Sequence, residues 1–234
     1  MNRNSLILAA GLALALPATG AMAQQSSVTG ISWSYFDIAA QHVSPDESAL
    51  ESNTGLALRG SGMINPNWHL FLGWNRGKLE GGTHIGDNEI AIDEDINRFH
   101  FGLGYNLPVA ARTDLFARVA YERVSSADFL VTTPAGVIGG ELEGTEGYSL
   151  EVGVRSALGR NWEVGGSLRH IFMDDPEATI GAGDAINIGG LVDDDHTALV
   201  LNGQYKFNNG WGVIAEADVG SAYQSLLLGV RLSY

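Results

Sequence analysis

The sequence predicts an all-β fold, an antiparallel up-and-down transmembrane β-barrel of about ten strands, with eight strands as the alternative. Three observations predict it. Apolar residues alternate with small or charged ones along most of the chain after residue 30, the alternating segments are long, and the turns between them are alternately short and long. The chain contains no cysteine, which excludes a disulfide scaffold and any cysteine-based metal or redox site.

Charge and hydropathy narrow the class of protein further. The formal net charge of −14 argues against a nucleic-acid partner, because phosphate backbones bind basic surfaces. Beyond the N-terminus no apolar run reaches the roughly 20 residues that a membrane-spanning helix needs. A helical membrane protein is therefore excluded.

The first 23 residues have the three-part layout of a secretory signal peptide. A polar start with Arg3 is followed by an apolar stretch from Leu6 to Leu16 and by a small-residue end, Ala21-Met22-Ala23. We expect cleavage after Ala23 and therefore export. Residues 24–30 are interpreted as a linker, and 31–234 as the barrel domain.

Ten segments show the strand pattern of period two. Each has about 9 to 13 residues, which is longer than an ordinary globular strand and matches a tilted membrane strand. They lie near 31–43, 54–64, 68–79, 96–107, 114–126, 147–158, 162–173, 197–207, 211–219 and 224–234.

The connections between these segments alternate in length. Brief turns such as Asn65-Pro66-Asn67 alternate with long links at 44–53, 80–95, 127–146 and 174–196. Short periplasmic turns and long outward loops are typical of outer-membrane barrels. An even number of strands places both chain ends at the periplasmic side.

The contents of the two strand faces decide which one touches lipid. One face carries bulky apolar residues, and the other carries glycine, alanine and serine with scattered long charged side chains. Small residues leave room inside a narrow barrel for arginine and glutamate to pair, so we expect the charged face to point inward. The predicted lumen charge network comprises Arg59, Arg98, Arg118, Glu122, Glu151, Arg155, Glu163, Arg169, Lys206, Glu216, Asp218 and Arg231.

Tryptophans recur at equivalent strand ends. Trp68, Trp162 and Trp211 each follow a brief turn directly, and Trp33 lies at the start of the first segment. This placement predicts a periplasmic aromatic girdle, where amphipathic rings are favoured. An outer girdle is predicted from Trp74, Tyr121 and Phe172.

The C-terminal segment carries the most specific resemblance. The chain ends in a pattern that resembles the insertion signal of outer-membrane barrels, formed here by Leu226, Leu228, Val230, Leu232 and the terminal Tyr234. Outer-membrane barrels present this signal to the barrel-assembly machinery, and the signal usually ends in Phe. Residues 28–234 resemble the small outer-membrane β-barrels of Gram-negative bacteria, the OmpA/OmpX-like group. The resemblance implies a monomeric barrel inserted in the outer membrane and implies no particular activity.

The long links contain 20 of the 27 acidic residues and no Lys or Arg. Repulsion between these carboxylates predicts extended, mobile loops that form a solvated anionic rim. A second interpretation is calcium or magnesium binding that bridges to anionic lipopolysaccharide. Weak divalent sites are then expected at Asp93, Glu94 and Asp95, and at Asp193, Asp194 and Asp195. No other cofactor is expected.

Three functional hypotheses follow. A nearly balanced interior favours an interlocked core, and so a non-catalytic barrel that contributes to envelope integrity or surface interaction through its acidic loops. The alternatives are a narrow diffusion pore and a hydrolase at the outer rim. A hydrolase would use His170 with Asp174 and Asp175, or His196 beside Asp195.

Overall fold

The computed structural model describes residues 28–46, 50–85, 88–133, 136–175, 177–180, 186–187, 195–207 and 210–234. The predicted signal peptide lies outside these residues. Within them the regular elements are strands: β1 (Tyr35–Pro45), β2 (Asn53–Met63), β3 (Trp68–Ile85), β4 (Asn88–Ala110), β5 (Thr113–Val124), β6 (Ala127–Thr133), β7 (Gly136–Leu142), β8 (Glu146–Leu158), β9 (Trp162–Met173), β10 (Glu177–Ile180), β11 (Ile186–Asn187), β12 (His196–Lys206), β13 (Trp211–Gly220) and β14 (Tyr223–Ser233). Across this part of the chain, no helix has both the length and the apolar character needed to cross a bilayer.

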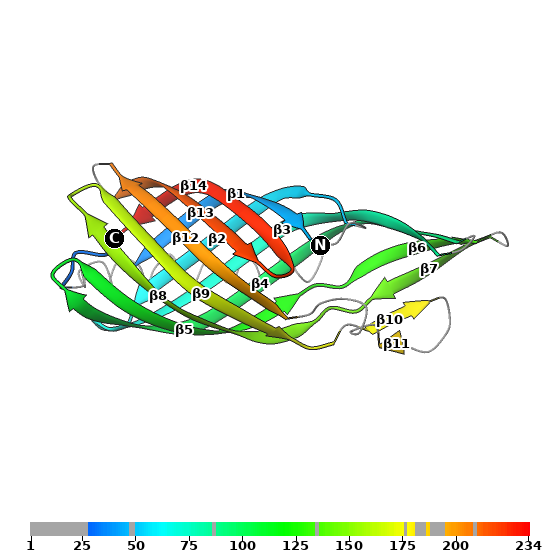
Figure 1. Ribbon diagram of the computed structural model, residues 1–234, viewed down its shortest axis with the longest axis horizontal. Helices are drawn as coiled ribbons and strands as arrows, with labels where there is room; N and C mark the ends of the chain where they lie inside the picture. The colour runs from blue at the N-terminus through cyan, green and yellow to red at the C-terminus, as the bar shows by residue number, and fades with distance from the viewer. Residues whose placement is uncertain are drawn as a thin grey trace, which may run out of the picture.

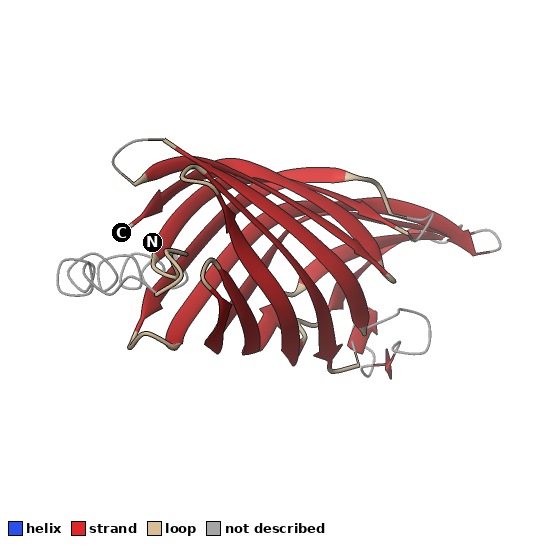
Figure 2. Cartoon of the chain, turned by 60° about the vertical axis from the view of Figure 1, so that its left-hand side comes forward, coloured by secondary structure: helices blue, strands red, loops and turns tan. Residues whose placement is uncertain are grey.

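Ten of the strands close into an antiparallel barrel, which confirms the predicted fold and strand number. The ring runs β1-β2-β3-β4-β5-β8-β9-β12-β13-β14, and β1 pairs with both β2 and β14. Figures 1 and 2 show the tilted wall of strands. Closure leaves no unpaired edge in the wall, which lipid would not tolerate.

The outer face of the wall is apolar. On β8, for example, Tyr148, Leu150, Val152 and Val154 are all exposed, whereas Ser149 and Arg155, on the opposite face, are buried. The exposed apolar positions of β8 run from Tyr148 to Leu158, the length that a tilted membrane strand needs. The large side chains therefore face outward, as the alternation predicted.

Two of the expected loops are strands instead. β3 and β4 continue well past the wall, and β6 and β7 form a hairpin that pairs with β4. Together with β10 and β11 they form an outward arm, defined as 78–85, 88–95, 127–133, 136–142, 177–180 and 186–187, which projects from the barrel end opposite the C-terminus (Figure 1). The prediction of mobile loops at 80–95 and 127–146 was wrong for these residues.

The arm folds because its charges find partners across the strands and because one of its faces is apolar. Arg76 lies 2.5 Å from Asp95, and Lys78 lies 2.5 Å from Asp93. Ala127, Val131 and Ala178 are buried on one face. The long links contain no cation, but the neighbouring strand supplies two, which reduces the repulsion that the sequence pattern suggested.

The first strand begins later than predicted. Residues 31–34 do not join β1, which starts at Tyr35. They follow a turn at Gly30, whose positive φ of 74° suits glycine, and they are largely buried. This short segment lies at the periplasmic end and fills part of the barrel interior.

Arginine substitutions at two depths of the wall test its contact with lipid. Val152→Arg, at the centre of β8, should lower the free energy of unfolding in phosphatidylcholine vesicles by about 2 to 4 kcal/mol, because it places a charge in hydrocarbon. Leu158→Arg, near the periplasmic end of the same strand, should lower it by only about 0 to 1 kcal/mol. Denaturant titration followed by tryptophan fluorescence measures both. Equal losses would contradict the assigned depth.

Candidate functional site: the barrel interior

The interior is the chemically richest part of the barrel. The twelve charged side chains assigned to the lumen network come from eight of the wall strands, and all lie on inward-facing positions. Small inward residues make room for larger groups. A Cβ at Gly104, for instance, would lie only 2.2 Å from the ring of His69.

Near the outer mouth, Glu122 is held from two sides. Its carboxylate accepts a hydrogen bond from Arg98 Nε at 3.2 Å and another from Ser149 Oγ at 2.7 Å. Arg98 Nη1 also donates to the hydroxyl of Tyr223 at 2.8 Å. These contacts join β4, β5, β8 and β14 across the lumen.

A buried histidine completes this outer layer. The ring of His196 stacks on Tyr223 with the centroids 3.9 Å apart, and its Nδ1 accepts the backbone N–H of Ala222 at 3.3 Å. Its Nε2 lies 3.4 Å from Asp218, which also pairs with Arg169. Both ring nitrogens are thus occupied by structural contacts.

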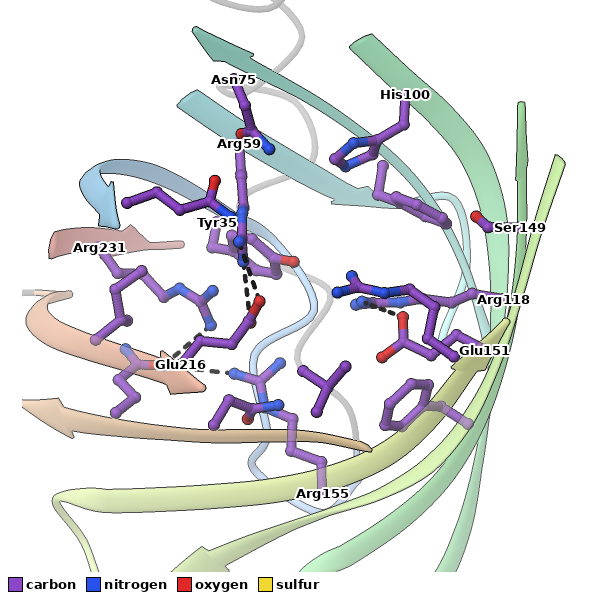
Figure 3. A pocket seen from close by; sticks show the side chains of 18 of the residues that line it. Tyr35, Arg59, Asn75, His100, Arg118, Ser149, Glu151, Arg155, Glu216 and Arg231 are labelled. Atoms are coloured by element: carbon purple, nitrogen blue, oxygen red, sulfur yellow. Dashed lines mark hydrogen bonds and ion pairs between the residues drawn. The ribbon is translucent and has the colours of Figure 1, made fainter. Parts of the chain in front are cut away.

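The middle of the lumen is crossed by two further pairs (Figure 3). Arg59 binds Glu216 in a bidentate arrangement, with both N–O distances at 3.0 Å. Arg118 lies 3.6 Å from Glu151, whose carboxylate also accepts a hydrogen bond from Ser167 at 2.5 Å. Bidentate geometry is the strongest form of this contact.

The lower layer lies closer to the short turns. Glu163 pairs with both Arg155, at 2.5 Å, and Lys206. Arg231 makes two contacts with Asp37, at 2.6 and 2.7 Å, and Asp37 is fully buried. The sequence analysis missed Asp37, although it has the same inward parity as Tyr35 and Ala39.

Asp37 and the equally buried Asp114 change the charge balance inside the barrel. With them, the seven cations of the network face seven carboxylates, rather than the excess of cations that the sequence suggested. The carboxylates are those of Asp37, Asp114, Glu122, Glu151, Glu163, Glu216 and Asp218. Buried charges are tolerated when paired, as six of these carboxylates are with the cations, while Asp114 accepts a hydrogen bond from Trp33.

Trp33 is the clearest correction among the predicted site residues. It was assigned to the periplasmic girdle but is fully buried inside the barrel. Its Nε1 donates to Asp114 at 2.8 Å, and its ring stacks on His69 with the centroids 4.7 Å apart. The physical reason is that residues 31–34 turn inward before β1 begins, so the alternation of the strand does not apply to Trp33.

The segment around Trp33 lies in the lower end of the lumen. The guanidinium groups of Arg118 and Arg155 lie 5.4 and 5.1 Å from the Trp33 ring centroid, within reach of cation–π attraction. Trp33 also forms a buried apolar cluster with Ile31, Met63 and Phe116. We call residues 31–34 the N-terminal plug.

Little open space is left between these groups. The cavity among the charged layers has a volume of about 100 Å³ and is lined by Arg59, Arg98, Arg118 and Glu216, among others. The arrangement is chemically suited to filling the lumen and holding opposite walls together.

The predicted hydrolase residues are distributed differently from the prediction. Asp195 and His196 are neighbours in an extended segment, so their side chains point to opposite faces, and His196 pairs with Asp218 inside the barrel. His170 lies on the outer face, where Nδ1 contacts Thr197 Oγ1 at 2.6 Å and Nε2 lies 3.9 Å from Asp195. Among the described residues, His170 thus contacts Asp195 and Thr197, whereas His196 contacts Asp218 rather than its neighbour Asp195.

The predicted divalent sites at the rim receive no geometric support from the described residues. Within the described ranges, no group of three or more histidine or acidic side chains is placed to hold a metal ion. Asp93, Glu94 and Asp95 lie in β4, where successive side chains alternate between faces and do not converge. Asp193 and Asp194 lie outside the described residues, whereas Asp195 is close to His170.

The other three girdle tryptophans lie on the outer wall. Trp68, Trp162 and Trp211 are about half exposed at the short-turn end. Trp68 packs edge-on against Tyr105, and Trp162 against Tyr205. Nearer the outer mouth, Phe101, Tyr121 and Tyr148 form a continuous row of aromatic contacts.

The C-terminal strand presents its predicted signal residues to the outside. Leu226, Leu228 and Val230 are exposed on β14, and Leu232 and Tyr234 are partly exposed. The backbone N–H of Tyr234 donates to the carbonyl of Ser34 at 3.1 Å. The last residue is thereby tied to the N-terminal plug.

A family model described as outer membrane protein beta-barrel domain matches residues 7–189. The chain belongs to this family. Membership in the outer membrane protein beta-barrel domain family places the barrel wall in the lipid of a Gram-negative outer membrane. It leaves the specific activity open, because the fold serves several functions.

Solved structures with the same architecture differ widely in sequence. The outer membrane protease OmpT of Escherichia coli has a TM-score of 0.53 at 10% identity, covering 86% of this chain and 96% of its own. The translocator domain of the autotransporter NalP of Neisseria meningitidis has 0.50 at 12% identity, covering 97% of each chain. The toluene transporter TbuX of Ralstonia pickettii has 0.46 at 8% identity, covering 92% and 93%. These likenesses concern the fold alone.

The curated proteins contain no match to this sequence.

Removing one partner of a central ion pair tests the interior network. Glu216→Ala should lower the free energy of unfolding by about 3 to 5 kcal/mol, because it leaves Arg59 charged and unpaired in the lumen. The double variant Arg59→Met with Glu216→Leu should lose less. Asp95→Ala, which breaks an exposed pair with Arg76, should cost less than about 1 kcal/mol. Equal losses for Glu216→Ala and Asp95→Ala in vesicle unfolding would contradict the role of the network.

Proposed function

We propose that this protein is a closed, non-catalytic outer-membrane barrel that holds an acidic β-structured arm at the cell surface. The single observation that supports it most is the filled interior. Three layers of paired charges cross the lumen, and the N-terminal plug packs beneath them. A barrel filled in this way serves as an anchor for what it presents outside.

The arm supports a role in surface interaction. β4 alone has 23 residues, about twice the length that a membrane strand needs, so its outer half extends beyond the bilayer. The long connections of such barrels face outward, which assigns the arm to the external side. Its acidic composition keeps it solvated and disfavours anionic partners.

A hydrolase is the less favoured function. The ring nitrogens of His196 are occupied by Ala222 and Asp218, and the side chain is almost completely buried. In the described part of the chain, His170 has Asp195 as a carboxylate neighbour at 3.9 Å, which is beyond hydrogen-bond distance. A general base needs a positioned partner, and the contacts of these described residues give neither histidine such a partner in an accessible site.

The route to the membrane is part of the proposal. We infer export through a signal peptide at 1–23, followed by insertion through the barrel-assembly machinery, which would read the exposed side chains of β14 and the terminal Tyr234. The inserted protein would be a monomer, because the ten-stranded wall closes on itself. Lipopolysaccharide would surround the outer rim, and divalent cations would bridge it to the acidic arm.

Current measurements in planar lipid bilayers test the closed state. The wild-type protein should give no steady conductance, because paired charges and the plug occupy the lumen. The double variant Trp33→Ala with Glu216→Ala should give conductance steps, since it removes the plug ring and one central ion pair.

Folding of both proteins is checked by heat-modifiable gel migration, so that an unfolded variant is not mistaken for a closed one. Steady conductance by the folded wild-type protein would instead support the narrow diffusion pore.

A further inference from the structure

One face of the β6–β7 hairpin is exposed, partly apolar and acidic at its border. Leu130 lies opposite Gly139, and Thr132 lies opposite Val137, so these residues share a face. Leu130 is 54% exposed and Val137 is 63% exposed. The opposite face of β6 includes the buried Ala127 and Val131. We call the face with Leu130 and Val137 the hairpin face.

Two carboxylates lie directly across from each other on this face. Asp128 on β6 pairs in register with Glu141 on β7, and both are exposed. No ion pair connects either one to another described residue, unlike Asp93 and Asp95 on the neighbouring strand. Like charges in a direct cross-strand pair destabilise a sheet. A cation brought by a partner would relieve that repulsion.

The surface beside Leu130 is unobstructed. A Cβ at Gly139 would meet no other atom within 4 Å, so bare backbone is accessible there. An apolar side chain of a partner could therefore lie against Leu130 and Val137 while a neighbouring cation reaches Asp128 and Glu141. Apolar contact surrounded by complementary charge is the usual organisation of a protein interface.

We propose that the hairpin face docks a basic, extended protein segment in which a lysine or arginine and an apolar residue stand two positions apart. Residues two positions apart in an extended chain point to the same face, so the apolar side chain and the cation reach the hairpin face together. The inference rests on the proposed role of the arm in surface interaction, and it names the chemistry of the partner.

The test uses a short synthetic peptide that repeats lysine, serine, valine and serine, so that lysine and valine share one face, and it is labelled with a fluorophore. Its binding to the full-length protein in phosphatidylcholine nanodiscs is measured by fluorescence anisotropy. Zwitterionic lipid keeps the peptide from binding the membrane through charge. A peptide that repeats glutamate, serine, valine and serine is the matched probe.

The wild-type protein should bind the lysine–valine peptide, with an affinity that falls as salt is raised. Asp128→Asn with Glu141→Gln should weaken binding about tenfold, and Leu130→Ser with Val137→Ser by a similar factor. Two control variants are Ile138→Ser, on the opposite face of β7, and Asp46→Asn, outside the arm. Both variants should bind the lysine–valine peptide with an affinity within about twofold of wild type.

Several results would overturn the proposal. One is unchanged peptide binding when Asp128 and Glu141 are neutralised, and another is equal binding of the glutamate–valine peptide. Binding of calcium but not of the peptide would identify the carboxylate pair as a cation site instead. Failure of the closed-barrel function would appear as wild-type conductance, and it is therefore distinguishable from failure of peptide binding.

Discussion

Everything inside this barrel depends on the pairing of charges that have no access to bulk water. An arginine or glutamate enclosed by the wall costs several kcal/mol unless a partner neutralises it and accepts or donates its hydrogen bonds. Asp37 supplies such a partner to Arg231, and Asp114 accepts a hydrogen bond from Trp33; both carboxylates are fully buried. The wall can have an apolar outer face because the charges on its inner face are paired with one another.

The same constraint explains the glycines and the N-terminal plug. Gly104 leaves room for His69, and His69 stacks on Trp33. Trp33 in turn donates to Asp114 and lies beside the guanidinium of Arg155. A segment outside the strand ladder is thus held by the interior network, and Ser34 connects it to Tyr234 at the end of the chain. The contacts that close the barrel and the contacts that fill it therefore depend on each other.

The sequence could predict the wall because a period of two is a local property. The assignment of Leu150 and Val152 to lipid and of Arg155 to the lumen needs only the alternation and the size of the side chains. Asp37 could have been found by the same rule. Trp33 could not, because it precedes the strand and its position depends on contacts with residues far along the chain.

The strands of the outward arm could not be predicted from the sequence for a related reason. A count of the acidic residues within a loop does not include the cations of the neighbouring strand, although Lys78 of that strand pairs with Asp93. Strand pairing in the arm depends on β4 meeting β6, a contact between distant parts of the chain. Rim residues such as Asp195 and His196 were likewise paired by sequence proximity, although an extended chain separates neighbours onto opposite faces.

Depth-dependent fluorescence quenching tests the inside-out arrangement most directly. Variants that each retain one of the tryptophans are placed in vesicles whose lipids carry bromine, a contact quencher of indole. Emission from Trp68, Trp162 and Trp211 should fall strongly, because these rings are exposed on the wall, whereas Trp33 should be unaffected inside the barrel. Strong quenching of Trp33, or none at the three wall tryptophans, would contradict the account.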